Sequence, residues 1–155
     1  MLTVELAQFC QSGVSIVLAS CGRDGEPVVG RGLASQIDEP GTVRIVLRQS
    51  SNSGLFRAIR DGGGLAVTFT KPTTHRSIQL KAGAARPCPP AAQDGPAAMA
   101  QTAAFSADLV ACGYPEDFSR AYCAFAPDDL AAVAFVPDQA FVQTPGPGAG
   151  SALSP

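Results

Sequence analysis

The chain has 155 residues, of which 46% are apolar, so we expect a single domain with a substantial core. Its formal net charge of −2 gives it no overall basic field for nucleic-acid binding. No apolar run is long enough to span a bilayer, and the N-terminus lacks the basic segment of a signal peptide, so a cytoplasmic protein is expected.

Cysteine and histidine usage limits the possible chemistry. The five cysteines are scattered and form no CxxC pair, and His75 is the only histidine. This pattern indicates reduced thiols and no metal site. A catalytic thiol remains a minor alternative, because activation of a thiol requires a base or a cation that the sequence cannot place.

The first third of the chain predicts a short helix followed by three strands. The helix is expected at 2–11, and the strands at 14–20, 27–37 and 42–48. Turns are expected at Gly22-Arg23-Asp24-Gly25 and Asp38-Glu39-Pro40-Gly41. In the second strand Val29, Arg31, Leu33, Ser35 and Ile37 would share one face. Gly30 and Gly32 leave the other face nearly bare, which indicates either close approach of a ligand or a bulge in a barrel.

The segment RIVLRQSSNSGLFRAIR, residues 44–60, passes from a strand through a serine-rich turn into a short helix. Backbone N–H groups at such a turn, together with the helix dipole, can bind an anion. The Arg48 guanidinium and the serine hydroxyls would complete a phosphate pocket. The alternative is that Ser51 or Ser53 only caps the helix.

The remainder predicts four more strands, two helices and a tail. Strands are expected at 65–70, 75–83, 130–136 and 140–144, helices at 97–112 and 114–122, and a loose tail rich in Pro, Gly and Ala at 145–155. In the strand at 75–83 an apolar face alternates with a polar row that includes Gln79 and Lys81. That row is either a solvated face or the lining of a ligand groove. Because the connections between strands are too short for parallel crossovers, we expect a mainly β or α+β antiparallel barrel with peripheral helices, formed by residues 1–144.

Three blocks of sequence resemble the flavin-binding split-barrel superfamily that includes the pyridoxamine 5′-phosphate oxidases. They are SIVLASCGRDGEPVVGRGLAS, IVLRQSSNSGLFRAIRDGGGLAVTF and THRSIQLKAG. The resemblance implies a homodimer with FMN at the subunit interface. It places the FMN phosphate on Arg48, Gln49, Ser50, Ser51, Asn52 and Ser53, and the rest of the flavin on Arg31, Gly32, Leu33, Gln79 and Lys81.

The resemblance therefore predicts an FMN-dependent oxidoreductase acting on an unknown small molecule. The chain lacks the basic turn and the Arg-rich late strand with which those oxidases hold the phosphate of their substrate, so pyridoxamine 5′-phosphate is not the expected substrate. Deazaflavin users and haem binders also belong to the superfamily. The alternative is a non-catalytic flavin- or haem-binding module, with His75 as the candidate haem ligand.

Overall fold

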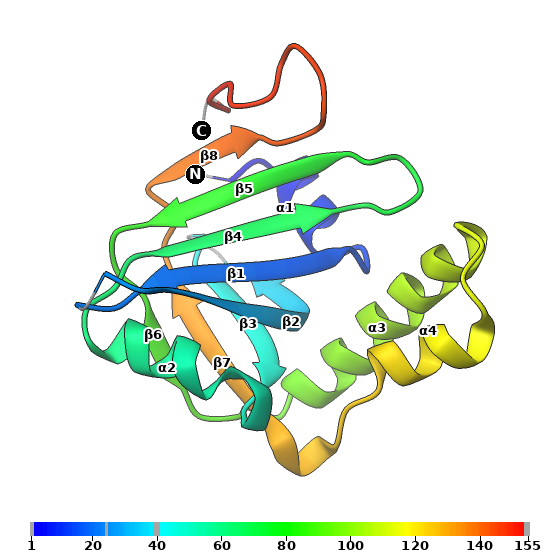
Figure 1. Ribbon diagram of the computed structural model, residues 1–155, viewed down its shortest axis with the longest axis horizontal. Helices are drawn as coiled ribbons and strands as arrows, with labels where there is room; N and C mark the ends of the chain where they lie inside the picture. The colour runs from blue at the N-terminus through cyan, green and yellow to red at the C-terminus, as the bar shows by residue number, and fades with distance from the viewer. Residues whose placement is uncertain (1, 24, 39–40, 154–155) are drawn as a thin grey trace.

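The computed structural model describes residues 2–23, 25–38 and 41–153, and its main feature is one sheet of eight antiparallel strands. The strand order is β6-β7-β3-β2-β1-β4-β5-β8, and the sheet coils into an open barrel with helices around it (Figure 1). Along the chain the elements are α1 (Val4–Cys10), β1 (Ser15–Cys21), β2 (Pro27–Ile37), β3 (Val43–Arg48), η1 (Ser50–Asn52), α2 (Ser53–Arg60), β4 (Leu65–Thr70), β5 (Ser77–Ala82), β6 (Arg86–Cys88), α3 (Asp94–Ala111), α4 (Glu116–Cys123), η2 (Pro127–Asp129), β7 (Leu130–Phe135) and β8 (Gln139–Val142). The expected antiparallel split barrel is confirmed.

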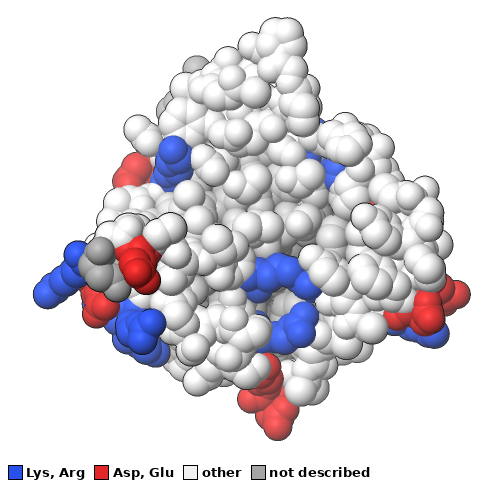
Figure 2. All heavy atoms as spheres, in the orientation of Figure 1, with Lys and Arg blue, Asp and Glu red and all other residues white. Residues whose placement is uncertain are grey.

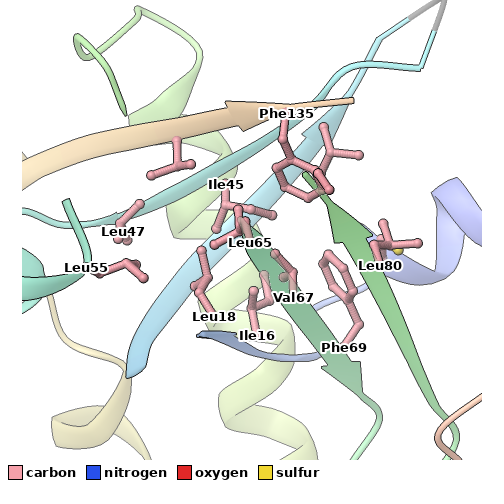
Figure 3. Close-up of a cluster of buried hydrophobic side chains, with 14 of the residues drawn as sticks. Ile16, Leu18, Ile45, Leu47, Leu55, Leu65, Val67, Phe69, Leu80 and Phe135 are labelled. Carbon is pink, nitrogen blue, oxygen red and sulfur yellow. The ribbon is translucent and has the colours of Figure 1, made fainter. Parts of the chain in front are cut away.

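The barrel is filled by the apolar side chains that alternate along its strands. Figure 3 shows these side chains converging from β1, β3, β4, β5 and β7, with Leu55 closing the cluster from α2. The most deeply buried include Ile16, Leu18, Ile45, Leu47, Leu55, Val67, Phe69 and Leu80. The apolar face predicted for β5 is therefore correct.

A β-bulge in β2 changes which residues face the core. The pairing of β2 with β3 shifts between Gly32 and Ala34. Leu33 and Ala34 both pack in a second cluster with Val46, beneath α3. Ser35 turns inward, where its hydroxyl donates to the Cys10 carbonyl at 2.8 Å. The prediction that Leu33 and Ser35 share a face is wrong, because the extra residue reverses the alternation beyond Gly32.

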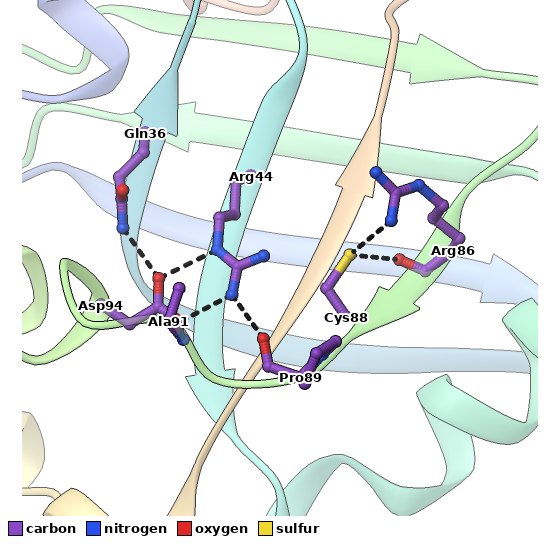
Figure 4. Close-up of polar contacts among 7 residues, drawn as sticks. All are labelled: Gln36, Arg44, Arg86, Cys88, Pro89, Ala91 and Asp94. Atoms are coloured by element: carbon purple, nitrogen blue, oxygen red, sulfur yellow. Dashed lines mark hydrogen bonds and ion pairs between the residues drawn. The ribbon is translucent and has the colours of Figure 1, made fainter.

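The Pro-rich segment before α3 contains a short strand, β6, that its composition did not predict. This segment is fixed by Asp94, whose carboxylate is fully buried and receives hydrogen bonds from Arg44 Nε at 2.9 Å and Arg44 Nη2 at 2.7 Å (Figure 4). Gln36 and the Ala91 N–H also donate to it. Burial by itself would raise the pKa of Asp94, but these hydrogen bonds outweigh it and the pKa lies below its ordinary value.

Residues 145–153 fold back onto β8, which differs from the expected loose tail. The Val142 N–H donates to the Ser151 carbonyl at 2.9 Å, and the Leu153 N–H donates to the Ala140 carbonyl at 2.8 Å. In the first predicted turn the Gly25 N–H bonds the Gly22 carbonyl, while Asp24 lies outside the described residues. Glu39 and Pro40 of the second predicted turn also lie outside them.

Within the described ranges, no helix is long and apolar enough to cross a membrane, and no group of His, Cys, Asp and Glu could hold a metal ion. The cysteines are free thiols. Burial raises the pKa of the Cys10 thiol to about 12, which keeps it protonated and unreactive.

Candidate functional site

A cavity of about 420 Å³ opens on the outer face of the sheet, where β1, β2 and β3 meet η1. It is lined by Val17, Val29, Gly30, Arg31, Arg48, Ser51 and Asn52. Figure 2 shows two groups of Lys or Arg atoms bordering a pit near the middle of a face that is otherwise largely uncharged. Four residues of the predicted site, Arg31, Arg48, Ser51 and Asn52, are therefore brought together at one cavity.

Asn52 connects the two arginine-bearing strands to the serine turn. Its Oδ1 accepts from the Arg31 backbone N–H at 3.1 Å, and its Nδ2 donates to the Arg48 carbonyl at 2.7 Å. The side chain is buried, and Nδ2 also approaches the Ser51 hydroxyl at 3.3 Å. Because Ser51 Oγ accepts this bond, its O–H proton can point to a ligand in the cavity.

The Arg31 and Arg48 guanidiniums converge on the end of α4. Both donate to the backbone carbonyl of Tyr122, and the Arg31 guanidinium carbon lies 3.5 Å from the centroid of the Tyr122 ring. In the described part of the chain, neither guanidinium forms an ion pair with a carboxylate. The cavity wall therefore carries two positive charges that face a neutral acceptor.

The pKa shifts agree with this arrangement. Partial burial lowers the pKa of the Arg31 guanidinium, and the neighbouring Arg48 charge lowers it further. Burial also raises the pKa of the Cys123 thiol, although the two arginines act in the opposite direction. An anion in the cavity would relieve the repulsion between the guanidiniums and stabilise both charges.

The serine turn itself is partly occupied by Asp129, from the segment that leads into β7. The Asp129 carboxylate accepts from the Ser50 N–H at 2.8 Å and the Ser50 hydroxyl at 2.6 Å. The Gln49 N–H donates to the Asp129 carbonyl at 2.7 Å. Hydrogen bonds from Ser50 lower the pKa of Asp129. The turn thus binds an anion, as its sequence predicts, but that anion is a side chain of the same protein.

The structure places three other predicted residues away from the cavity. Gly32 faces the barrel interior, where a Cβ would lie 2.7 Å from Ile16 Cγ2 and 2.8 Å from Ile45 Cγ2. Gly32 therefore lies at the bulge and faces the core. This agrees with the interpretation of the glycine as part of a barrel bulge rather than as a ligand-facing position. Leu33 is buried beneath α3, and Ser53 is exposed at the start of α2.

Gln79 and Lys81 lie on the same sheet face as the cavity, two strands beyond β1. Directly paired residues point to the same side of a sheet, and the register joins Arg31, Val17, Thr68 and Gln79 in one row. Three strand spacings make this row about 14 Å long. Gln79 donates to Thr68 Oγ1 at 3.0 Å, whereas Lys81 lines a separate cavity of about 700 Å³.

Sequence reasoning missed Tyr122, Asp129 and Val17. Asp129 contacts Ser50 across 79 positions of chain, and nothing local to either residue indicates that contact. Tyr122 does carry a local signal, because Tyr114, Phe118 and Tyr122 recur at four-residue spacing and so form one stripe on a helix.

Comparison with known proteins identifies the fold. No protein-family profile and no curated protein sequence matches the chain. Among solved structures, HupZ of Group A Streptococcus is 14% identical with a TM-score of 0.58, over 97% of this chain and 99% of that chain. A putative pyridoxamine 5′-phosphate oxidase of Lactobacillus delbrueckii is 15% identical with a TM-score of 0.55, over 90% and 93%. A pyridoxamine 5′-phosphate oxidase-related, FMN-binding protein of Nostoc punctiforme is 12% identical with a TM-score of 0.51, over 98% and 95%.

The chain has the pyridoxamine 5′-phosphate oxidase-like split-barrel fold. A haem-binding protein of Mycobacterium smegmatis also shares this split barrel, at 13% identity and a TM-score of 0.50, although the match covers only 56% of that protein. Proteins with this fold thus include one named for FMN binding and one named for haem binding, so the fold alone assigns no cofactor to this chain.

Proposed function

We propose that this split barrel is an FMN-binding protein that holds the flavin phosphate at the Arg31–Arg48 cavity. The observation that carries the proposal is the convergence of two guanidiniums, without a carboxylate partner among the described residues, on a cavity that also contains the Ser51 hydroxyl. Paired arginines are suited to a phosphate ester, because each presents a planar fork of donors.

The row that runs from Arg31 to Gln79 supports an elongated, flat ligand. Val17 and Thr68 between the two ends have short side chains, and Val17 is 40% exposed. A flavin lying on these strands would have its phosphate at the cationic end and its ring toward the amide of Gln79. Of the predicted phosphate ligands, Ser50 is less suited to this role, since its N–H and its hydroxyl both bond the Asp129 carboxylate. The Gln49 N–H bonds the Asp129 carbonyl, which leaves only the side-chain amide of Gln49 for a ligand.

We propose further that the protein is an oxidoreductase that acts on a small molecule. Bound FMN supplies the electron or hydride transfer. The protein's own residues bind and orient the cofactor. The Gln79 amide and the Lys81 ammonium lie on the sheet face where a ring would rest, and either can donate to negative charge there.

A homodimer is part of the proposal. Val29, beside the cavity, is 68% exposed, and the surrounding face carries few charges (Figure 2). A second copy that covers this face would bury these side chains and exclude water from a ring resting on the sheet. Size-exclusion chromatography with light scattering tests this part, since a monomer at micromolar concentration would contradict it.

Haem binding is less well supported by the site. His75, the candidate axial ligand, lies in the exposed turn between β4 and β5 with a positive φ of 58°, and it does not line the Arg31–Arg48 cavity. An absorption spectrum of the purified protein separates the alternatives, because FMN and haem have distinct bands.

The deciding experiment is a titration of ligand-free protein with FMN and with riboflavin, which lacks the phosphate. Tighter binding of FMN than of riboflavin, with the difference lost in Arg48→Ala, is the expected result. Equal affinities for FMN and riboflavin would contradict the proposal that the cavity binds the phosphate. Turnover of a nicotinamide donor by the FMN-loaded protein then tests the oxidoreductase.

A further inference from the structure

Arg31 forms the inner end of a stacked column of side chains. Its guanidinium carbon lies over the Tyr122 ring, 3.5 Å from the centroid. Tyr122 stacks on Phe118 with centroids 5.8 Å apart, and Phe118 stacks on Tyr114 at 5.3 Å. The interplanar angles in the two ring pairs are 20° and 19°. Phe105 of α3 contacts Tyr122 in a tilted arrangement at 6.2 Å. The outer members of this column, which we call the aromatic column (Tyr114, Phe118, Tyr122), are partly exposed.

The backbone of Tyr122 acts on the same arginines as its ring. Its carbonyl is one of the last in α4, where the intrahelical ladder leaves acceptors without partners and the helix dipole is negative. Arg31 and Arg48 both donate to this one oxygen. A carbonyl differs from a carboxylate in an important respect: it orients the two cations without neutralising them.

We propose that Tyr122 is a positioning residue for the anion site, which fixes the Arg31 guanidinium in its ligand-binding orientation while leaving its charge uncompensated. This inference rests on the proposed function of the Arg31–Arg48 cavity. An arginine side chain has many rotamers, and a guanidinium that is already ordered loses less entropy when it binds an anion. The Tyr122 ring holds the guanidinium over its face, and the hydrogen bond to the Tyr122 carbonyl sets the direction in which the guanidinium points.

Burial lowers the pKa of Arg31 and the Tyr122 hydroxyl counteracts this, but the hydroxyl supplies neither the stacking face nor the carbonyl. Stacking requires the aromatic face, and the carbonyl belongs to the main chain. Phenylalanine should therefore substitute for Tyr122, whereas leucine should not. A role for Tyr122 in packing α4 alone would make no such distinction in the order of the Arg31 guanidinium.

The experiment compares Tyr122→Leu, Tyr122→Phe and Met99→Ala, the last being an exposed apolar change on α3 outside the column. Affinities for FMN and riboflavin are measured by titration at moderate salt. We expect Tyr122→Leu to bind FMN roughly five-fold more weakly than the unmodified chain, with little change for riboflavin. Tyr122→Phe should restore the FMN affinity, and Met99→Ala should not alter it. Equal FMN affinity in the unmodified chain and Tyr122→Leu would overturn the proposal.

A second readout needs no cofactor. In the unmodified protein the guanidinium N–H protons of Arg31 should be shifted upfield in the NMR spectrum, because the guanidinium carbon lies 3.5 Å from the Tyr122 ring centroid. Tyr122→Leu should abolish this shift and Tyr122→Phe should retain it. Persistence of an ordered, slowly rotating guanidinium in Tyr122→Leu would contradict the positioning role. Arg31→Lys, which leaves α4 intact but removes the planar fork, gives a further check by losing FMN affinity while keeping the charge.

These readouts separate this inference from the function on which it rests. If the unmodified protein does not distinguish FMN from riboflavin, the proposed function fails, and the NMR comparison still decides whether Tyr122 orders Arg31. If the phosphate preference is present but insensitive to Tyr122→Leu, the function stands and the positioning role is refuted.

Discussion

Asp129 binds Ser50 through two hydrogen bonds, from the backbone N–H and from the hydroxyl, at 2.8 and 2.6 Å. A carboxylate thus sits where the sequence of the turn predicts a ligand's phosphate. It fastens the serine turn to the start of β7 and leaves anion binding to the neighbouring arginines.

Asp129→Asn should strengthen FMN binding. The amide keeps an acceptor for Ser50 but removes a negative charge near Arg48, so we expect roughly two- to five-fold tighter binding at low salt. The gain should shrink as salt is added, and riboflavin affinity should not change. A gain of equal size for riboflavin would show that the substitution acts through the shape of the turn.

Arg48→Ala should weaken FMN binding by about 1 to 3 kcal/mol, because it removes a charge-assisted hydrogen bond to the phosphate. Arg57→Ala is the matched control, since Arg57 is an exposed arginine on α2. Isothermal titration at moderate salt measures both. Unchanged affinity in Arg48→Ala would place the phosphate elsewhere.

Asn52→Ala should destabilise the fold by about 2 kcal/mol, measured by urea unfolding. The change removes the partner of the Arg31 N–H and of the Arg48 carbonyl in a buried position. Asn52→Asp should instead act mainly by weakening FMN binding, because it places a negative charge beside both arginines. Native stability in Asn52→Ala would mean that water replaces the side chain without loss.

The Asp94–Arg44 pair should make stability depend on pH in the acid range. The folded-state pKa of Asp94 is depressed, so its contribution is complete above the ordinary aspartate pKa of about 4 and is lost as pH falls toward the lower folded value. Asp94→Asn should cost about 3 kcal/mol at neutral pH, because Arg44 loses its buried partner. The variant should also show a shallower loss of stability between pH 5 and pH 3 (about the range where aspartates titrate). An unchanged acid profile would assign that loss to other carboxyl groups.

Two glycines near the site should respond in opposite directions to alanine. At Gly30 a Cβ would lie 2.5 Å from Asn52 Oδ1 and 2.6 Å from Leu55 Cδ2, so Gly30→Ala should destabilise the fold by about 1 to 3 kcal/mol. At Gly54, in α2, the nearest atom would be Val28 Cγ1 at 3.8 Å. Gly54→Ala should therefore stabilise it by about 0.5 to 1 kcal/mol. Thermal unfolding of both variants checks the pair, and a stable Gly30→Ala would show that Asn52 can move aside.

The barrel could be predicted from the sequence because its strands alternate, and because alternation is a local property. Ile78, Leu80 and Ala82 face the core for that reason. The bulge after Gly32 could not be placed, since a glycine within a strand fits either a bulge or a ligand face. β6 was not predicted because it contains Pro87, and proline argues against a strand. The proline is tolerated because this strand pairs on one side only.

The site was predicted only in part. The resemblance assigns Arg48 to the phosphate and Arg31 to the rest of the flavin, whereas the pairing of β2 with β3 brings both to one cavity. The contact between Ser50 and Asp129 depends on how β7 enters the sheet beside β3, which no local pattern records. Tyr122 belongs to the site only because the end of α4 lies beside Arg31 of β2. The periodic aromatic stripe of α4 does not by itself indicate where that helix packs.

Residues 145–153 fold back along β8 and so limit the pairing of this sheet edge with strands of other molecules. β8 is the last strand at one end of the sheet, and the hydrogen bonds to Ser151 and Leu153 cover part of its outer side. A bare strand border invites pairing with a neighbouring molecule, and continued pairing produces fibrils. The folded-back segment thus protects against such polymerisation, and fusions or truncations that disturb it should reduce solubility before they disturb the barrel.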